Sequence, residues 1–352
     1  MTGIRVAPEQ VRAFCTEALA AAGVPAQDAA VVAANLVEAE LRGLSSHGVS
    51  RLSIYIDSLL KGDYNPRPDI KILQEHNSTM LIDGDFAMGA ISGTRAMSLC
   101  LEKAQQAGAS FAAVCKGTHF GIAGFYSMMA LERNMIGIAM CNSIRLMSVY
   151  GGISRMLGTN PLSIAVPAGI RYPLVFDAAT SQVAVGKIMV AELEGQKIPE
   201  GWAIDQCGRP TTDPKEAMAG AALPFGGYKG SGLAIMVNVF SAMLSGAFLS
   251  ARAGEAQAEL IKEDEIAFFF GAIDVASFQD VDTFKQGIDA MIEELKSSPK
   301  AAGAEEIYMP GELEYLRKES NTRHGIEIGA GVLRELQDIK NKLTLTNNPD
   351  QW

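Results

Sequence analysis

Apolar residues recur at helical spacing through the first 61 residues of the chain. The pattern predicts a helix from Pro8 that stops at Gly23, a second helix over about 28–41, and a third over 46–61. Two prolines in the following DYNPRPDIKIL stretch predict an extended connection out of this helical region.

From Ile70 onward, short apolar runs of β type alternate with glycine-rich turns and helical patterns. The predicted strands are 79–85, 109–115, 135–141, 162–167, 173–179 and 265–275. The predicted helices are 91–108, 122–133, 231–250 and 281–295, and the charged C-terminal tail is mostly helical. A helical N-terminus followed by mixed elements predicts an α+β architecture.

Composition and charge narrow the classes of function. The chain has 352 residues, of which 48% are hydrophobic, and its formal net charge of -10 argues against a nucleic-acid partner. No uninterrupted apolar run approaches the length of a membrane span, and no signal peptide is evident. Five scattered cysteines without CxxC spacing indicate reduced, buried thiols, which favours a cytoplasmic protein.

The stretch SSHGVSRLSIY contains one of only four histidines in the chain. On a helix over 46–61, His47, Arg51 and Tyr55 would share one arc, opposite a clean apolar face. An imidazole, a guanidinium and a phenol in a row suit the binding of a small carboxylate, which arginine grips with two hydrogen bonds. The alternative is an ordinary solvated polar face.

A second histidine, His119, stands in the glycine-rich GTHFGIAGFY segment between a predicted strand and a predicted helix. An accessible histidine in such a turn suits general acid–base catalysis, because its pKa lies near neutrality. The other interpretation is a simple turn cap.

Three glycine-rich or small-residue turns could offer backbone N–H groups to a phosphate or ribose: GTNPLS, FDAATS and GGYKGSG. The last precedes a long helix and carries Lys229, but it lacks the Walker spacing. No GxGxxG follows a strand at the start of a βαβ unit either, so a Rossmann or P-loop fold is not supported. No metal-ligand spacing such as HExxH is present, and we expect no metal.

Taken together, the segments SSHGVSR, GTHFGIAGFY, MCNSIRLMSVYGG, GTNPLSIAVP, FDAATS and LPFGGYKGSGLAIMVNVFSAMLSGA resemble the type-2 malate/L-lactate dehydrogenase family, in the order expected for it. The resemblance spans nearly the whole chain, and segment 198–217 looks most like the ureidoglycolate dehydrogenase branch. It implies a helical domain and a mixed-sheet, non-Rossmann nicotinamide-binding domain. The expected boundaries are 1–70, joined by 315–352, for the helical domain and 71–314 for the cofactor domain.

The resemblance also implies roles for individual residues. His119 would transfer the proton, although His47 has been given that role in related enzymes, and Arg51 and Tyr55 would bind the substrate. The residues expected at the dinucleotide are Ser143, Asp177, Ala178, Ala179, Lys229, Gly311 and Glu312. The cofactor would be NAD, with NADP as the alternative, and the active site would be completed at the interface of a homodimer.

The expected reaction moves a hydride between nicotinamide and C2 of a small 2-hydroxy or 2-oxo acid. Arg145 departs from the proline or small residues often found in this family and adds a positive charge, which would suit a second acidic group on the substrate. The alternative is that Arg145 points to solvent. Reduction of a cyclic imine acid or an N-substituted 2-imino acid is the competing enzymatic activity, and a binding protein without activity is the competing class.

Overall fold

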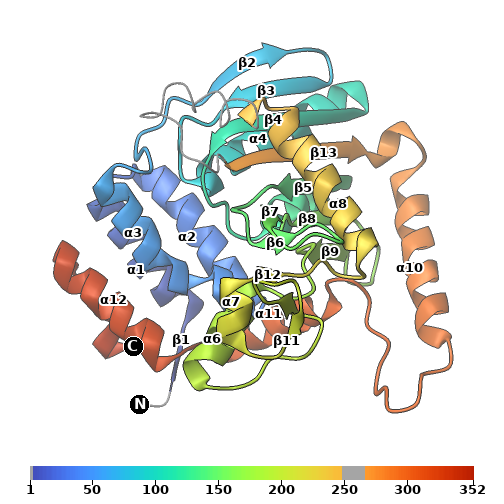
Figure 1. The fold of residues 1–352 in the computed structure, drawn as a ribbon. Coiled ribbons are helices and arrows are strands. Elements are labelled where there is room, and N and C mark those ends of the chain that lie inside the picture. The colour runs from blue at the N-terminus through green and yellow to red at the C-terminus, as the bar shows by residue number, and fades with distance from the viewer. Residues whose placement is uncertain (1–2, 248–265) are drawn as a thin grey trace.

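We describe the fold from a computed structural model, which covers residues 3–247 and 266–352 (Figure 1). Helices and mixed sheets make up the chain, as the α+β prediction required. Within the described ranges, no helix is both long enough and apolar enough to cross a membrane.

A seven-stranded mixed sheet forms the centre of the molecule, in the order β2-β3-β4-β13-β5-β8-β9. Only the β3–β4 pair is parallel. The strands are β2 (Lys71–Glu75), β3 (Thr79–Asp83), β4 (Ala109–Gly117), β5 (Met135–Cys141), β8 (Leu162–Val166), β9 (Leu174–Ala178) and β13 (Ile266–Asp274). The aromatic run of β13 is buried at the centre of this sheet, where Phe268 and Phe270 pack on Phe120.

A smaller five-stranded sheet has the order β11-β10-β12-β6-β7. Its strands are β6 (Met147–Ser148), β7 (Arg155–Leu157), β10 (Ala203–Ile204), β11 (Pro210–Thr211) and β12 (Ala221–Ala222). The helices α6 (Val185–Glu194) and α7 (Pro214–Ala219) lie in the same part of the chain. The side chain of Asp213 caps α7 by accepting from two backbone N–H groups.

The N-terminal helices are α1 (Pro8–Ala21), α2 (Ala26–Leu41) and α3 (Leu52–Lys61). Their hydrophobic core also contains side chains from the C-terminal segment, among them Ile326, Leu336 and Ile339. Strand β1 (Ile4–Val6) pairs with β14 (Ile326–Ile328), which ties the two ends of the chain together. The remaining helices are α4 (Gly89–Ala107), α5 (Ala123–Ser127), α8 (Tyr228–Asn238), α10 (Val281–Ser297), α11 (Glu312–His324) and α12 (Ala330–Leu343).

The predicted helix over 46–61 was wrong in its first turns. Two 3₁₀ turns, η1 (Ser45–His47) and η2 (Val49–Arg51), precede α3, which begins only at Leu52. Gly48 separates the two turns with φ -88° and ψ -146°, a conformation that no α-helix can continue through. His47 and Arg51 therefore do not share a face of one helix with Tyr55.

Two other predicted helices also differ from the structure. The 122–133 segment divides into α5 and the 3₁₀ helix η3 (Met128–Arg133). The predicted 231–250 helix begins earlier, as α8, and continues as the wider π turn η4 (Val239–Met243). Its predicted end at Ser250 lies outside the described residues, as does Glu265 at the start of the strand predicted over 265–275.

Candidate active site

The structure brings together residues that are far apart in the sequence. Tyr55 projects from α3, and its hydroxyl lies 2.7 Å from Nδ1 of His119, which follows the end of β4. The His47 ring stacks on the His119 ring, with 5.6 Å between centroids and 24° between planes. Tyr55 is only 4% exposed, so its hydroxyl contacts the imidazole from the protein interior. Its predicted contact with substrate stays a prediction.

Arg51 stands at the end of the second 3₁₀ turn, beside this cluster. Its Nε donates to the backbone carbonyl of Ser46 at 2.7 Å, which fixes the base of the guanidinium. Among the described residues, Arg51 forms no ion pair with an acidic side chain. The site therefore holds a positioned cation next to two imidazoles, as a carboxylate-binding site requires.

Burial and neighbouring charge keep both imidazoles neutral. Both residues are partly exposed, yet burial, followed by the His47 and Arg51 charges, lowers the pKa of His119 to about 3. Burial and the Arg51 charge lower the pKa of His47 to about 4. Burial raises the pKa of Tyr55, which stays a neutral phenol. The predicted proton transfer by His119 or His47 stays a prediction.

Hydrogen bonds of Ser143 join its loop to the loop of Thr159 and Asn160. Its backbone N–H donates to Asn160 Oδ1 at 3.1 Å, and its hydroxyl accepts from Thr159 N at 2.9 Å. Asn160 is fully buried and bonds the α8 helix through Ala234 O. The arrangement fastens the Ser143 turn to α8, the helix that also carries Lys229.

Asp177 lies near the end of β9 and accepts from the backbone N–H of Gly124 at 2.7 Å. Asp177 is exposed, yet the surrounding protein atoms raise its pKa to about 6. The Gly124 N–H and the Arg42 charge oppose this shift. Ala178 and Ala179 follow and are partly exposed. Their small side chains leave the backbone approachable, which is compatible with a dinucleotide.

Helix α8 begins directly after Gly226 and Gly227, and Lys229 is exposed in its first turn. Both glycines have positive φ, of 56° and 64°, and a Cβ on Gly226 would meet open space. A cation at a helix N-terminus beside an open backbone suits a phosphate group. Lys229 thus fits the chemistry of a dinucleotide phosphate, and its predicted contact with the cofactor stays a prediction.

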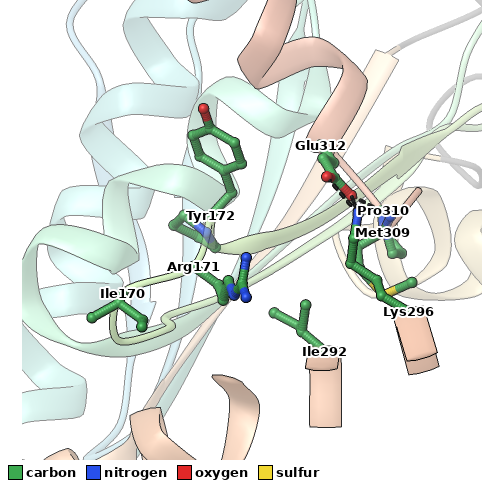
Figure 2. Close-up of a pocket in the computed structure, with 9 residues that line it drawn as sticks. Ile170, Arg171, Tyr172, Ile292, Lys296, Met309, Pro310 and Glu312 are labelled. Carbon is green, nitrogen blue, oxygen red and sulfur yellow. Dashed lines mark hydrogen bonds and ion pairs between the residues drawn. The ribbon is translucent and has the colours of Figure 1, made fainter. Parts of the chain in front are cut away.

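Gly311 and Glu312 begin α11 beside β9. Gly311 has φ +84° and leaves no room for a side chain, because a Cβ would lie 2.9 Å from Val175 O. The Glu312 carboxylate accepts from Lys296 Nζ at 2.7 Å and from Met309 N at 2.8 Å. Figure 2 shows Glu312 and Lys296 at one side of a cavity. The volume of this cavity is about 360 Å³. The cavity is lined by Ile170, Arg171, Tyr172, Pro173, Ile292, Lys296, Met309, Pro310 and Glu312.

The structure tests the prediction for the cysteines and leaves the role predicted for Arg145 untested. Arg145 is exposed in the loop after Ser143, and its predicted role at the substrate stays a prediction. Four cysteines are buried and free, whereas Cys207 is exposed, so the prediction of buried thiols was wrong for Cys207. In the described part of the chain, no group of three or more His, Cys, Asp or Glu side chains could hold a metal ion.

Sequence reasoning missed two buried polar residues of α2, Asn35 and Glu40, which bond the backbone just after the two histidines, at Phe120 and Val49. Polar residues among the apolar positions of an alanine-rich helix were the available signal.

Comparison with known proteins identifies the family of this chain. Residues 6–337 match the malate/L-lactate dehydrogenase family. A malate dehydrogenase from Pyrococcus horikoshii is 41% identical over 97% of this chain and 96% of its own length. An NAD(+) ureidoglycolate dehydrogenase from Escherichia coli O157:H7 is 30% identical, over 98% of this chain and 99% of its own. The structure of sulfolactate dehydrogenase from Methanocaldococcus jannaschii superposes with a TM-score of 0.87 at 37% identity, and covers 99% of both chains. The chain therefore belongs to the malate/L-lactate dehydrogenase family.

Proposed function

We propose that this protein is an NAD(P)-dependent dehydrogenase that moves a hydride between nicotinamide and C2 of a small 2-hydroxy or 2-oxo acid. One observation carries the proposal: a neutral imidazole pair, His119 and His47, beside a positioned guanidinium, with Tyr55 bonded to His119 at 2.7 Å. When bound, the cofactor accepts or donates the hydride. The relatives include malate, sulfolactate and NAD(+) ureidoglycolate dehydrogenases, which supports this choice of chemistry.

The side chains divide the work between binding and proton transfer. Arg51 holds the substrate carboxylate through the terminal nitrogens that remain after Nε bonds Ser46 O. Because Nδ1 of His119 contacts Tyr55, Nε2 is the nitrogen left for the substrate oxygen. In oxidation, Nε2 takes the hydroxyl proton while Nδ1–H donates to the Tyr55 oxygen. A hydroxyl can both donate and accept, so Tyr55 supports either tautomer of His119.

Reduction runs the same proton path backwards. The imidazole must first take up a proton, because its pKa of about 3 in the free protein leaves it neutral. An anionic substrate next to the ring stabilises the charged imidazolium. Substrate binding therefore raises the pKa of His119. The neutral ring of the free protein is therefore ready for oxidation, and reduction depends on the bound acid.

We further propose that the substrate carries a second acidic group, which Arg145 meets. The support is the position of Arg145 just after Ser143 and the malate and sulfolactate dehydrogenases among the relatives. The proposed residues at the dinucleotide are Ser143, Asp177, Ala178, Ala179, Lys229, Gly311 and Glu312.

A substrate panel tests the reaction and its specificity. Malate, sulfolactate, ureidoglycolate, lactate and a cyclic imine acid are assayed with NAD(H) and NADP(H) by absorbance of the reduced nicotinamide. We expect the dianionic acids to have the highest kcat/KM, and Arg145→Gln to lower kcat/KM for them about 10-fold while sparing lactate, as the loss of one charge-assisted hydrogen bond predicts. Turnover of the imine alone would contradict the proposed reaction, and an equal loss for lactate would contradict the role of Arg145.

We also propose a homodimer that completes the active site, located in the cytoplasm. The support for the dimer is an apolar surface along α8 and η4, whose large side chains are between 38% and 57% exposed. This surface consists of Ile235, Met236, Val239, Phe240, Met243 and Leu244.

Sedimentation equilibrium tests the dimer. The wild-type protein should sediment as a dimer, and Met236→Glu should shift it toward the monomer, because a charge is costly in an apolar interface. Gln105→Glu, on the exposed side of α4, is the matched control and should change nothing. A wild-type monomer at micromolar concentration would contradict the proposal.

A further inference from the structure

Helix α2 carries two buried polar side chains that the proposed reaction does not use. Asn35 is 2% exposed and Glu40 is 5% exposed, in a helix whose other buried residues are apolar. Asn35 bonds the backbone one residue after His119, and Glu40 bonds the backbone two residues after His47. A single helix thus contacts both halves of the candidate active site.

Asn35 fastens the turn of His119. Its Nδ2 donates to the carbonyl of Phe120, the next residue after His119, at 3.3 Å. The following residue, Gly121, has φ +78°, and a Cβ on it would lie 2.0 Å from Asn35 Oδ1. The glycine therefore lets the turn close onto the helix, and Asn35 supplies the bond that holds it there.

Glu40 fastens the backbone that follows His47, at the first residue of the second 3₁₀ turn. Its Oε1 accepts from the backbone N–H of Val49 at 2.8 Å. A Cβ on Gly48 would lie 2.1 Å from the same oxygen, so a glycine is again required where the turn meets the helix. Burial raises the pKa of Glu40 to about 7, opposed by the Val49 N–H. A buried carboxyl is costly in free energy, and its backbone bond here goes to Val49, two residues after His47.

We propose that Asn35 and Glu40 are positioning residues that set the spacing of the two histidines. They lie five positions apart on the helix, which corresponds to a fixed rise of about 7.5 Å. Because the helix is rigid and each turn is bonded to it, the His47 ring stays stacked on the His119 ring and Nδ1 of His119 stays at Tyr55. The proposal rests on the proposed function for its catalytic consequence, while the geometry itself can be tested without activity.

Substitutions distinguish the effect of losing one hydrogen bond from the effect of disrupting the fold. Asn35→Leu and Glu40→Leu keep the approximate side-chain volume and remove one bond each, whereas Glu40→Gln keeps an oxygen that can accept from Val49 N. We expect kcat to fall about 10- to 100-fold in each leucine variant, because misplacement by about 1 Å can cost 100-fold. Glu40→Gln should restore most of kcat. Gly48→Ala should imitate Glu40→Leu, since its Cβ would displace the carboxylate from Val49 N.

Histidine NMR gives a readout that does not depend on turnover. The chain has four histidines, and the exposed His76 and His324 serve as internal references. In the wild-type protein, the His47 and His119 ring signals should not titrate between about pH 8 and 5, because burial keeps their pKa values low. In Asn35→Leu the His119 signal should titrate within this window, in Glu40→Leu the His47 signal should, and in Glu40→Gln neither should.

Loss of general stability alone would lower the melting temperature and leave the ring titrations of the folded protein unchanged. Unchanged ring signals in both leucine variants, with kcat within about twofold of wild type, would overturn the proposal. If the protein shows no dehydrogenase activity on the panel, the proposed function fails, and the ring titrations still decide whether α2 positions the histidines.

Discussion

Replacing His119 with alanine is expected to lower kcat about 10²- to 10⁴-fold, the usual contribution of a positioned general acid or base. His119 is the histidine whose Nδ1 is held by Tyr55, so its Nε2 has a fixed direction. His47 stacks on it, and its Nδ1 contacts the exposed Ser46 hydroxyl at 2.9 Å. We therefore expect His47→Asn to reduce kcat less, with a larger effect on KM. Steady-state kinetics in both directions measures these parameters.

His76→Ala is the matched control, because His76 is exposed on the turn between β2 and β3. A His119 variant that keeps near wild-type kcat while the His47 variant is inactive would reverse the two roles.

The pH profile gives a second check. With a pKa of about 3, His119 is already deprotonated, so kcat/KM for oxidation should show no acid limb from this base down to about pH 5. A base with an ordinary histidine pKa would instead lose activity below about pH 6.5.

Replacing Arg51 with lysine is expected to lower kcat/KM for the 2-hydroxy acid about 10- to 100-fold. The guanidinium donates Nε–H to Ser46 O and keeps its terminal nitrogens for the substrate, whereas one ammonium group cannot do both in a planar fork. Loss of a hydrogen bond to a charged group costs about 1.5–3 kcal/mol, which corresponds to this range. Most of the effect should appear in KM, with a smaller decrease in kcat because C2 is held less firmly.

Lys229→Met provides the contrasting variant. If Lys229 meets the dinucleotide at the N-terminus of α8, this change should weaken NADH binding, followed by fluorescence, and leave KM for the acid nearly unchanged. Arg51→Lys should show the opposite pattern. An unchanged KM for the acid in Arg51→Lys would remove Arg51 from the substrate site.

The sequence predicted much of the secondary structure because local signals dominate there. Helix α1 follows from apolar spacing after Pro8, and β13 follows from a run of phenylalanines that can only be buried. Periodicity failed at 46–51, because Gly48 interrupts a pattern that otherwise reads as one helix. The apolar positions Val49, Leu52 and Ile56 keep their burial in either geometry, so the pattern could not distinguish them.

The candidate site also has features that the sequence predicted and features that it could not predict. The types of side chain, and the identity of His47, Arg51, Tyr55 and His119, were readable from motifs. Their arrangement was not, because Tyr55 and His119 are 64 residues apart and only the tertiary structure brings the Tyr55 hydroxyl to 2.7 Å from His119 Nδ1.

Protonation was decided by the tertiary structure as well, since the burial that lowers the His119 pKa comes from several elements at once. The sequence by itself determined the fold class, the family and the chemical groups available to the site. The tertiary structure alone decided that the Tyr55 hydroxyl contacts the His119 ring, and that α2 bonds the backbone just after each histidine through Asn35 and Glu40. The reason is physical: local patterns encode which residues are buried, whereas contacts between distant segments depend on how whole elements pack.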